Sequence, residues 1–184
     1  MSLTIAELSA QDLHGYKALR DSVMRQHEDA FTSDEHTESN RSASSYSQRL
    51  SVEQGGSCIF TLVAWRQGEL IGAVSLERDK RTKVAHIGHV VGMMVRGIAQ
   101  GQGIGKALMR DCVRRCEDNA SLDLLTLSVT ASNVAAKRLY ESFGFTAYGL
   151  LPYAIKIDNR YLGKQLMARP LRDLRDLAIE PSLT

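Results

Sequence analysis

The chain has 184 residues, of which 43% are hydrophobic and 24% are charged, an ordinary composition for a globular protein that buries a core. Its net charge of +2 is too small to indicate binding to nucleic acid or to a membrane surface. The first residues lack a basic segment followed by an apolar one, and no window approaches the roughly 20 apolar residues of a membrane span, so we expect a cytoplasmic protein.

The three cysteines are an odd number in a chain without a secretory signal. Cys112 and Cys116 stand one helical turn apart within an apolar stripe. No further Cys or His residues occur at the spacing of a metal site. We therefore expect buried free thiols in a reducing compartment, and no metal.

The N-terminal part alternates between regular and polar segments. Leu3, Ile5 and Leu8 indicate a first strand, and Asp12 is placed to cap a helix that continues to about Glu28. The polar run 32–57 is too short for a linker between domains. We expect it to be a helix-containing excursion on the surface, where functional residues are common.

Two strands are expected next, at 58–65 and 69–76, and the segment Arg66–Gly68 between them is typical of a hairpin turn. A third, longer strand is expected over 84–95. It contains two glycines, of which Gly92 is the second. Glycine inside a strand indicates a bulge or a close backbone neighbour.

The hydrophobic period changes at Gly103. Apolar residues then recur every four positions and predict a helix to about Asn119. A strand over 122–129 and a second helix over 133–143 follow, and Gly144 is placed to end that helix.

The segments 145–157 and 161–171 are expected to form a closing antiparallel pair, and the tail 172–184 is polar. This order of elements predicts an α+β fold with a mixed, mostly antiparallel central sheet flanked by helices. We expect a single domain over residues 1–171.

The strongest local signal is the glycine-rich turn 100–106 between a strand and a helix. Gly101, Gly103 and Gly105 let the backbone approach a ligand without an intervening Cβ. The first amides of the helix have no acceptor within it, so several of them can bind a pyrophosphate. The P-loop pattern would need glycine at Gln100, and the dinucleotide pattern fails in both registers.

What remains is Gln100-x-x-Gly103-x-Gly105, which resembles the A motif of the GNAT superfamily of N-acetyltransferases, Q/R-x-x-G-x-G/A. Downstream, the run ending at Phe145 resembles the B region of that superfamily, with Asn133 and Tyr140 in place. The resemblance covers almost the whole chain, and its specific part is 86–145. It implies the GNAT-like acyl-CoA N-acyltransferase fold and acetyl-CoA as co-substrate.

In the superfamily, the pantetheine arm of the coenzyme lies between two splayed strands, which correspond here to 90–95 and 122–129. A bulge at Gly92 would open this cleft, and a freed amide of Met94 or Val95 would polarise the thioester oxygen. The resemblance assigns coenzyme contacts to Met93, Met94, Val95, Gln100, Gly101, Gln102, Gly103, Ile104, Gly105, Lys106, Asn133 and Tyr140.

Two of these residues also have a structural interpretation. Asn133 at the start of its helix can act as the cap, or can bond to the coenzyme arm, and the two roles are compatible. Tyr140 lies two turns further on the same face, where a tyrosine can belong to the core. The resemblance implies that its hydroxyl protonates the departing thiolate as a general acid.

The general base departs from the superfamily pattern. Many relatives carry a glutamate on the long strand, and His89 stands at that position here. A neutral imidazole can accept a proton near pH 7, directly or through water. His86 is a second candidate, although a regular strand would place it on the opposite face. Water or another residue is the remaining alternative, since a histidine in a strand can be structural.

The C-terminal hairpin departs from the pattern as well. It resembles a subgroup that often has acidic residues at the positions of Leu151, Gly163 and Lys164. These positions border the acceptor pocket in relatives. The neutral and basic residues found here indicate a different acceptor, or have no consequence.

Together these expectations describe an N-acetyltransferase that moves the acetyl group of acetyl-CoA directly onto a primary amine, of a small molecule or a protein, through a ternary complex. The alternative is a non-catalytic acetyl-CoA sensor, which the missing strand glutamate favours and Tyr140 opposes. We expect no nucleic acid or membrane partner, and a monomer or homodimer.

Overall fold

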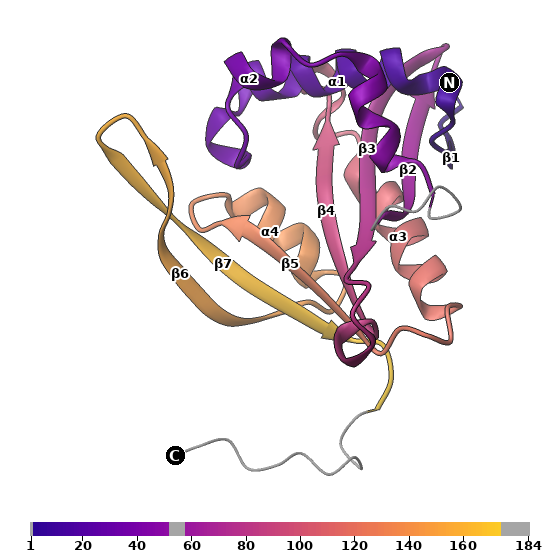
Figure 1. Cartoon of the computed structure of the whole chain (residues 1–184), viewed down its shortest axis with the longest axis vertical. Helices are drawn as coiled ribbons and strands as arrows, with labels where there is room; N and C mark the ends of the chain where they lie inside the picture. Colours follow the sequence, from indigo (N-terminus) through magenta and orange to yellow (C-terminus); the bar gives the residue numbers. More distant parts are fainter. Residues whose placement is uncertain (1, 52–57, 174–184) are drawn as a thin grey trace.

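The computed structural model describes residues 2–51 and 58–173. Its centre is a seven-stranded sheet in the order β1-β2-β3-β4-β5-β7-β6 (Figure 1). Among the described strands, β4 and β5 are parallel neighbours and the other neighbours are antiparallel, which confirms the expected mixed, mostly antiparallel α+β fold. The strands are β1 (Thr4–Glu7), β2 (Cys58–Arg66), β3 (Glu69–Arg78), β4 (Ile87–Val95), β5 (Leu124–Thr130), β6 (Thr146–Ile157) and β7 (Arg160–Pro170).

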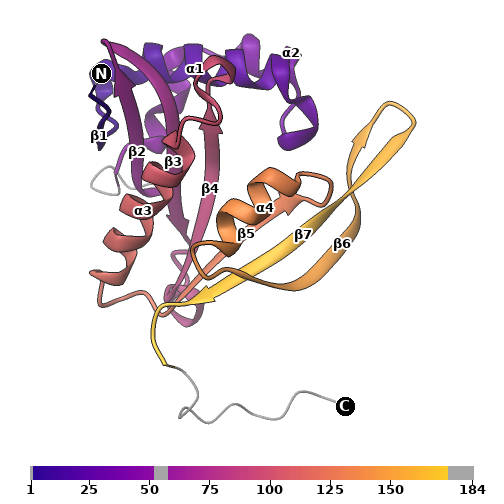
Figure 2. The ribbon, with the colours of Figure 1, turned by 180° about the vertical axis from the view of Figure 1, so that it is seen from behind.

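Helices cover both faces of the sheet. They are α1 (Leu13–Gln26), α2 (Glu35–Ser39), α3 (Ile104–Glu117) and α4 (Val134–Glu141), with the 3-10 helix η3 (Ala43–Arg49) after α2. Successive residues of a strand point to opposite faces. Leu62 of β2 accordingly packs in one core with α3 and α4, and Val63 packs in the other core with α1 and η3. Figure 2 shows α3 and α4 on the near side of the sheet.

β4 starts later than the sequence predicts. The expected strand 84–95 begins instead at Ile87, because a 3-10 helix occupies Thr82–Val84. The carboxylate of Asp79 accepts a hydrogen bond from the Arg81 amide at 2.8 Å, and this local turn competes with the strand.

The expected bulge at Gly92 is confirmed. Gly92 has a φ of 62°, and the register shifts beside it: Ser75 of β3 pairs with Val91, whereas Ala73 pairs with Met94. β4 therefore contains one extra residue between these pairs. Such a shift turns the following side chains to the opposite face.

β4 and β5 are paired over a short distance and then separate. Their register includes three residue pairs, from Ile87 with Leu124 to His89 with Thr126. Beyond His89 the described residues of the two strands form no further pairs, and β5 continues beside β7 as far as Thr130. Figure 1 shows β4 and β5 diverging from this point, so the sheet is open between them.

β6 and β7 form a long hairpin that extends past the rest of the sheet (Figures 1 and 2). β7 lies next to β5, where Lys164 pairs with Thr130. The hairpin thus forms one wall of the space beyond the open end of the sheet. Among the described residues, no helix is long and apolar enough to cross a membrane.

Candidate active site

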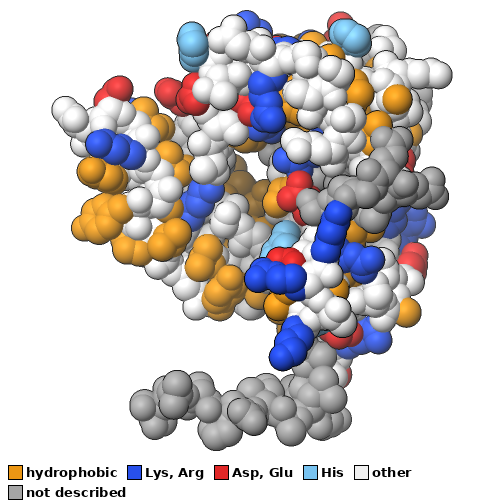
Figure 3. All heavy atoms as spheres, in the orientation of Figure 1, with side chains coloured by type: hydrophobic (Ala, Val, Ile, Leu, Met, Phe, Trp, Pro, Cys, Tyr) orange, Lys and Arg blue, Asp and Glu red, His pale blue; other side chains and the backbone are white. Residues whose placement is uncertain are grey.

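Two adjoining pockets meet at the opening between β4 and β5. The first, of about 790 Å³, lies between β4, β5 and the N-terminal helices, and we call it the gap pocket. The second, of about 750 Å³, lies between the glycine turn and the start of α4, and we call it the turn pocket. Figure 3 shows the hollow between the β6–β7 hairpin and the N-terminal helices, with basic side chains at its surface. Residues that line both pockets are Ala30, Phe31, Met93, Asn133 and Ala136.

The glycine turn presents backbone donors to the turn pocket. Gly101 and Gly103 have φ angles of 72° and 79°, and a Cβ built on either would meet no atom within 4 Å. Such left-handed backbone favours glycine. α3 begins at Ile104, so the amides of its first turn have no acceptor inside the helix and carry partial positive charge. This geometry suits an anionic group such as a pyrophosphate.

The two glutamines of the turn are placed differently. Gln100 lines the turn pocket, and its Nε2 donates to the Val95 carbonyl at 3.3 Å. Gln102 lines neither pocket. Its Nε2 donates to the Ile98 carbonyl at 2.8 Å. Of the turn residues predicted to bind the coenzyme, Gln102 is therefore the one whose side chain the structure directs elsewhere; Gly101, Gly103, Ile104, Gly105 and Lys106 line the turn pocket.

β4 contributes Met93, Met94 and Val95 to the lining of the turn pocket. Met93, directly after the bulge, lines the gap pocket as well. Because β5 has already separated, the main chain of this segment has no β5 partner among the described residues. An extended ligand can therefore bond to this strand edge in the manner of an added strand.

Asn133 is the N-cap of α4, which confirms the structural interpretation. Its Oδ1 accepts a hydrogen bond from the Ala136 amide at 3.0 Å. Within the described residues, its Nδ2 has no hydrogen-bond partner. Since Asn133 lines both pockets, this amide remains able to donate to a ligand.

Tyr140 belongs both to the core and to the site. Its ring meets Phe145 edge-on at a centroid distance of 6.2 Å, and the side chain is 7% exposed. The residue also lines the gap pocket. Burial, together with the nearby Cys112, raises the pKa of Tyr140 to about 12. The phenol therefore stays protonated at neutral pH and can donate a hydrogen bond.

His89 lies at the last residue pair between β4 and β5, where the opening in the sheet begins. His86 lies outside the opening. His89 lines the gap pocket, with its Nδ1 2.7 Å from the Thr126 Oγ1. When Thr126 accepts this hydrogen bond, Nε2 carries no proton and can accept one. His86 precedes β4, its carbonyl accepts hydrogen bonds from Asp123 and Leu124, and it lines neither pocket.

Glu77 is a site residue that the sequence analysis missed. It lies directly opposite His89 in the β3–β4 register, and both residues line the gap pocket. Its carboxylate forms an ion pair with Arg49 of η3. Strand alternation could have placed Glu77 on a face of β3, but only the register with β4 brings it beside His89.

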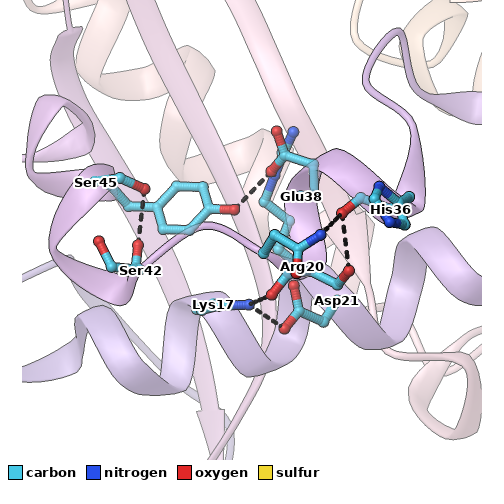
Figure 4. Close-up of polar contacts among 10 residues, drawn as sticks. Lys17, Arg20, Asp21, His36, Glu38, Ser42 and Ser45 are labelled. Atoms are coloured by element: carbon cyan, nitrogen blue, oxygen red, sulfur yellow. Dashed lines mark hydrogen bonds and ion pairs between the residues drawn. The ribbon is translucent and has the colours of Figure 1, made fainter.

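Arg20 of α1 reaches the gap pocket and is held by a buried acid (Figure 4). Its Nε donates to Glu38 Oε2 at 2.6 Å, the Tyr46 hydroxyl donates to the same oxygen at 2.6 Å, and Arg41 donates to Oε1 at 2.9 Å. Burial raises the pKa of Glu38, but the hydrogen bonds from Arg20 and Tyr46 outweigh this effect and lower it to about 2. The network fixes α2 and η3 against α1.

The segment after α1 crosses the open side of the sheet. Thr130 Oγ1 donates to the Asp29 carbonyl at 2.7 Å, and Lys164 Nζ donates to the Thr32 hydroxyl at 2.9 Å. Between these contacts, Ala30–Phe31 line both pockets. Residues 29–32 therefore cover the place where the two pockets meet. Among the described residues, no group of three or more His, Cys, Asp or Glu is placed to hold a metal ion.

Known proteins share this architecture. The model of the acetyltransferase (GNAT) family matches residues 17–145. The chain is 27% identical over 125 residues to the L-amino acid N-acetyltransferase AaaT of Escherichia coli, over 67% of this chain and 74% of that protein. It is 36% identical over 89 residues to the mycothiol acetyltransferase of Salinispora tropica, over 48% of this chain but 29% of that protein. A solved acetyltransferase of the GNAT family from Streptococcus pneumoniae shares the fold with a TM-score of 0.78 and 22% identity, over 92% of this chain and 99% of that one.

Proposed function

We propose, because the chain belongs to the acetyltransferase (GNAT) family and is an acyltransferase, that it moves the acetyl group of acetyl-CoA directly onto a primary amine. One observation carries the proposal: the turn pocket and the gap pocket adjoin at the opening in the sheet. A thioester that enters from the turn pocket meets an amine that enters from the gap pocket. Direct transfer requires this alignment of two substrates.

The backbone binds the coenzyme in this proposal. The pyrophosphate accepts hydrogen bonds from the amides of the glycine turn 101–106, and the pantetheine arm lies along Met93–Val95 as an added strand. The Nδ2 of Asn133 donates to the arm. An amide of Met94 or Val95 polarises the thioester oxygen, where negative charge develops as the amine attacks.

Two side chains handle protons. An amine is charged near neutral pH, and His89 accepts its proton through Nε2, directly or through water. The amine nitrogen then bonds to the thioester carbon, and the carbon–sulfur bond breaks as the sulfur takes a proton from Tyr140. The nitrogen loses its second proton to the phenolate, which restores Tyr140 and leaves a neutral amide. Apolar surroundings disfavour the thiolate as they disfavour the phenolate, so transfer from a phenol of raised pKa remains feasible.

The two cysteines whose side chains the structure describes support direct transfer over a covalent intermediate. Cys112 and Cys116 are 0% exposed and line neither pocket. A hydrogen bond with Cys116, together with burial, raises the pKa of the Cys112 thiol. A buried thiol with a raised pKa is a poor nucleophile.

A small-molecule acceptor fits better than a protein amino group. A pocket of about 790 Å³ has the volume of a typical small-molecule site. The relative with the longer match is named an L-amino acid N-acetyltransferase, which supports the same class of acceptor.

The proposal is tested by incubating the protein with acetyl-CoA and a panel of primary amines while free thiol is followed. We expect thiol release that depends on the amine, with one N-acetyl product formed per thiol. Binding of acetyl-CoA without thiol release on any amine would instead support the non-catalytic sensor.

A further inference from the structure

The gap pocket carries an excess of positive charge. Two of its cations are already paired, Arg49 with Glu77 of β3, and Arg20 with the buried Glu38. Within the described residues, Lys164 has no carboxylate partner. Its Nζ donates a hydrogen bond to the neutral hydroxyl of Thr32 instead. Among the described residues, no acidic group balances the charge of this cation.

Lys164 is held where a ligand can reach it. It is half-buried on β7, and its Nζ donates one of three available hydrogen bonds to Thr32. Burial lowers the pKa of Lys164, because the ammonium has lost water without gaining an opposite charge. A bound anion would supply that charge and accept the remaining hydrogen bonds.

The strand register places Lys164 and the candidate base His89 at opposite ends of the β5 segment that lines the gap pocket. Lys164 pairs with Thr130, and His89 pairs with Thr126, so their partners are four positions apart along β5. At roughly 3.3 Å per residue this is about 13 Å along the strand. The β5 residues between these ends line the gap pocket. A molecule with an amine at one end and an anion at the other fits this arrangement.

We propose that the amine acceptor carries a carboxylate and that Lys164 binds it. The inference rests on the proposed acetyl transfer and specifies the chemical class of its acceptor, an amino acid or a similar small molecule with both groups. A carboxylate matches the single unbalanced charge of Lys164, whereas a phosphate monoester carries nearly two negative charges at neutral pH. Lys164 is thus a specificity-determining residue, and it takes no part in the proton transfers.

The test uses matched pairs of acceptors, each amino acid and its primary amide, with α-amino and longer ω-amino acids in the panel. Rates are corrected for the fraction of unprotonated amine, since the two members of a pair differ in amine pKa. We expect the wild-type protein to prefer the acid by about 10- to 100-fold in kcat/KM, the range of a charge-assisted hydrogen bond.

Substitutions then assign this preference to one side chain. Lys164→Met should raise the KM for the acids by about tenfold or more. The KM for the amides and the KM for acetyl-CoA should stay unchanged. Lys164→Arg should keep most of the preference. Lys156→Met is the matched control, because Lys156 lies on β6 of the same hairpin, over the ring of Tyr161, and lines neither pocket.

Two results would overturn the inference and leave the proposed acetyl transfer intact. One is an equal kcat/KM of the wild type for acids and amides, and the other is an equal loss of kcat/KM on acids and amides in Lys164→Met. Thermal unfolding of each variant separates misfolding from lost recognition, and the folded Lys164→Arg variant must then retain the preference. Absence of thiol release with every acceptor would overturn the proposed function, and this inference with it.

Discussion

Tyr140 belongs to the core and also lines the gap pocket. The ring packs on Phe145 in the core, and the residue borders the gap pocket. Tyr140→Phe removes the donor and keeps the packing. We expect kcat to fall at least about tenfold, as for loss of a general acid, with little change in acetyl-CoA affinity. Steady-state kinetics and a coenzyme titration check this, with the exposed Tyr153→Phe as control; unchanged turnover would remove Tyr140 from the mechanism.

His89, with its hydrogen-bond partner Thr126, is predicted to remove the proton from the acceptor amine. His89→Ala should lower kcat/KM at pH 7 by about 100-fold. The deficit should narrow at higher pH, because the acceptor amine then loses its proton without help. Thr126→Val, which removes the partner of Nδ1, should show a smaller loss of the same pH dependence.

A pH–rate profile of each variant measures these effects, and Glu77→Gln is the comparison. Normal profiles for His89→Ala and Thr126→Val would exclude histidine as the base. A loss confined to Glu77→Gln would transfer the role to the carboxylate opposite His89 in the register.

The sequence allowed some of these residues to be predicted and not others. Asn133 and Tyr140 stand out because a helix start and a two-turn spacing are local features. Glu77 and Thr126 reach the site through strand pairing across the sheet, which no local pattern reveals. Gln102 matches the motif, yet its side chain bonds within the loop.

The glycine turn is the element on which coenzyme binding depends. Gly103→Ala places a Cβ on left-handed backbone and into the space of the proposed pyrophosphate, so both stability and acetyl-CoA affinity should fall. Gly68→Ala is the matched control, because Gly68 has a φ of 78° and equally open surroundings in the β2–β3 turn. Both variants should lose about 1–2 kcal/mol of unfolding free energy. Only Gly103→Ala should bind acetyl-CoA at least about tenfold more weakly, as measured by titration; equal affinities would exclude the turn as the phosphate site.

The network around Glu38 fixes the α2–η3 region, and its stability should depend on pH. The folded-state pKa of about 2 lies below the ordinary 4.5. The contribution is therefore complete above pH 4.5 and is lost as the pH falls through about 2. Glu38→Gln should lower the unfolding free energy by up to about 3 kcal/mol at pH 7, and by progressively less toward pH 2.

Urea titrations of the wild type and Glu38→Gln at pH 7, 4 and 2.5 measure this difference. Glu141→Gln on the exposed side of α4 is the control and should cost little at any pH. A difference that stays constant down to pH 2.5 would contradict the ion-pair account of the network.

Most elements follow from hydrophobic period, glycine position and turn signals, which are local. The helices 104–117 and 134–141 and the hairpin strands lie close to their predicted ranges. The start of β4 was predicted wrongly, because the apolar pattern reaches back to Val84 while the backbone of Thr82–Val84 forms a 3-10 helix. The bulge at Gly92 is one of the two outcomes that glycine inside a strand indicates, whereas Gly88 of the same strand keeps the regular register with β3.

The opening in the sheet is a property of the whole molecule. It requires β4 to pair with β5 at one end only and β7 to occupy the far edge of β5. It also requires the segment after α1 to cover the gap. These contacts join residues far apart in the chain, so their geometry could be expected only from the resemblance and not from the periodicity. The part of the site that would bind the acceptor depends most on such contacts, so the sequence alone did not predict the acceptor.

The central claim is that amides of the turn 101–106 and the free edge of β4 bind acetyl-CoA. Titration calorimetry of acetyl-CoA into the folded protein tests it most directly. The account predicts saturable binding of one coenzyme per chain, weakened in Gly103→Ala and unaffected in Gly68→Ala. Absence of saturable binding to the folded wild-type protein would contradict it.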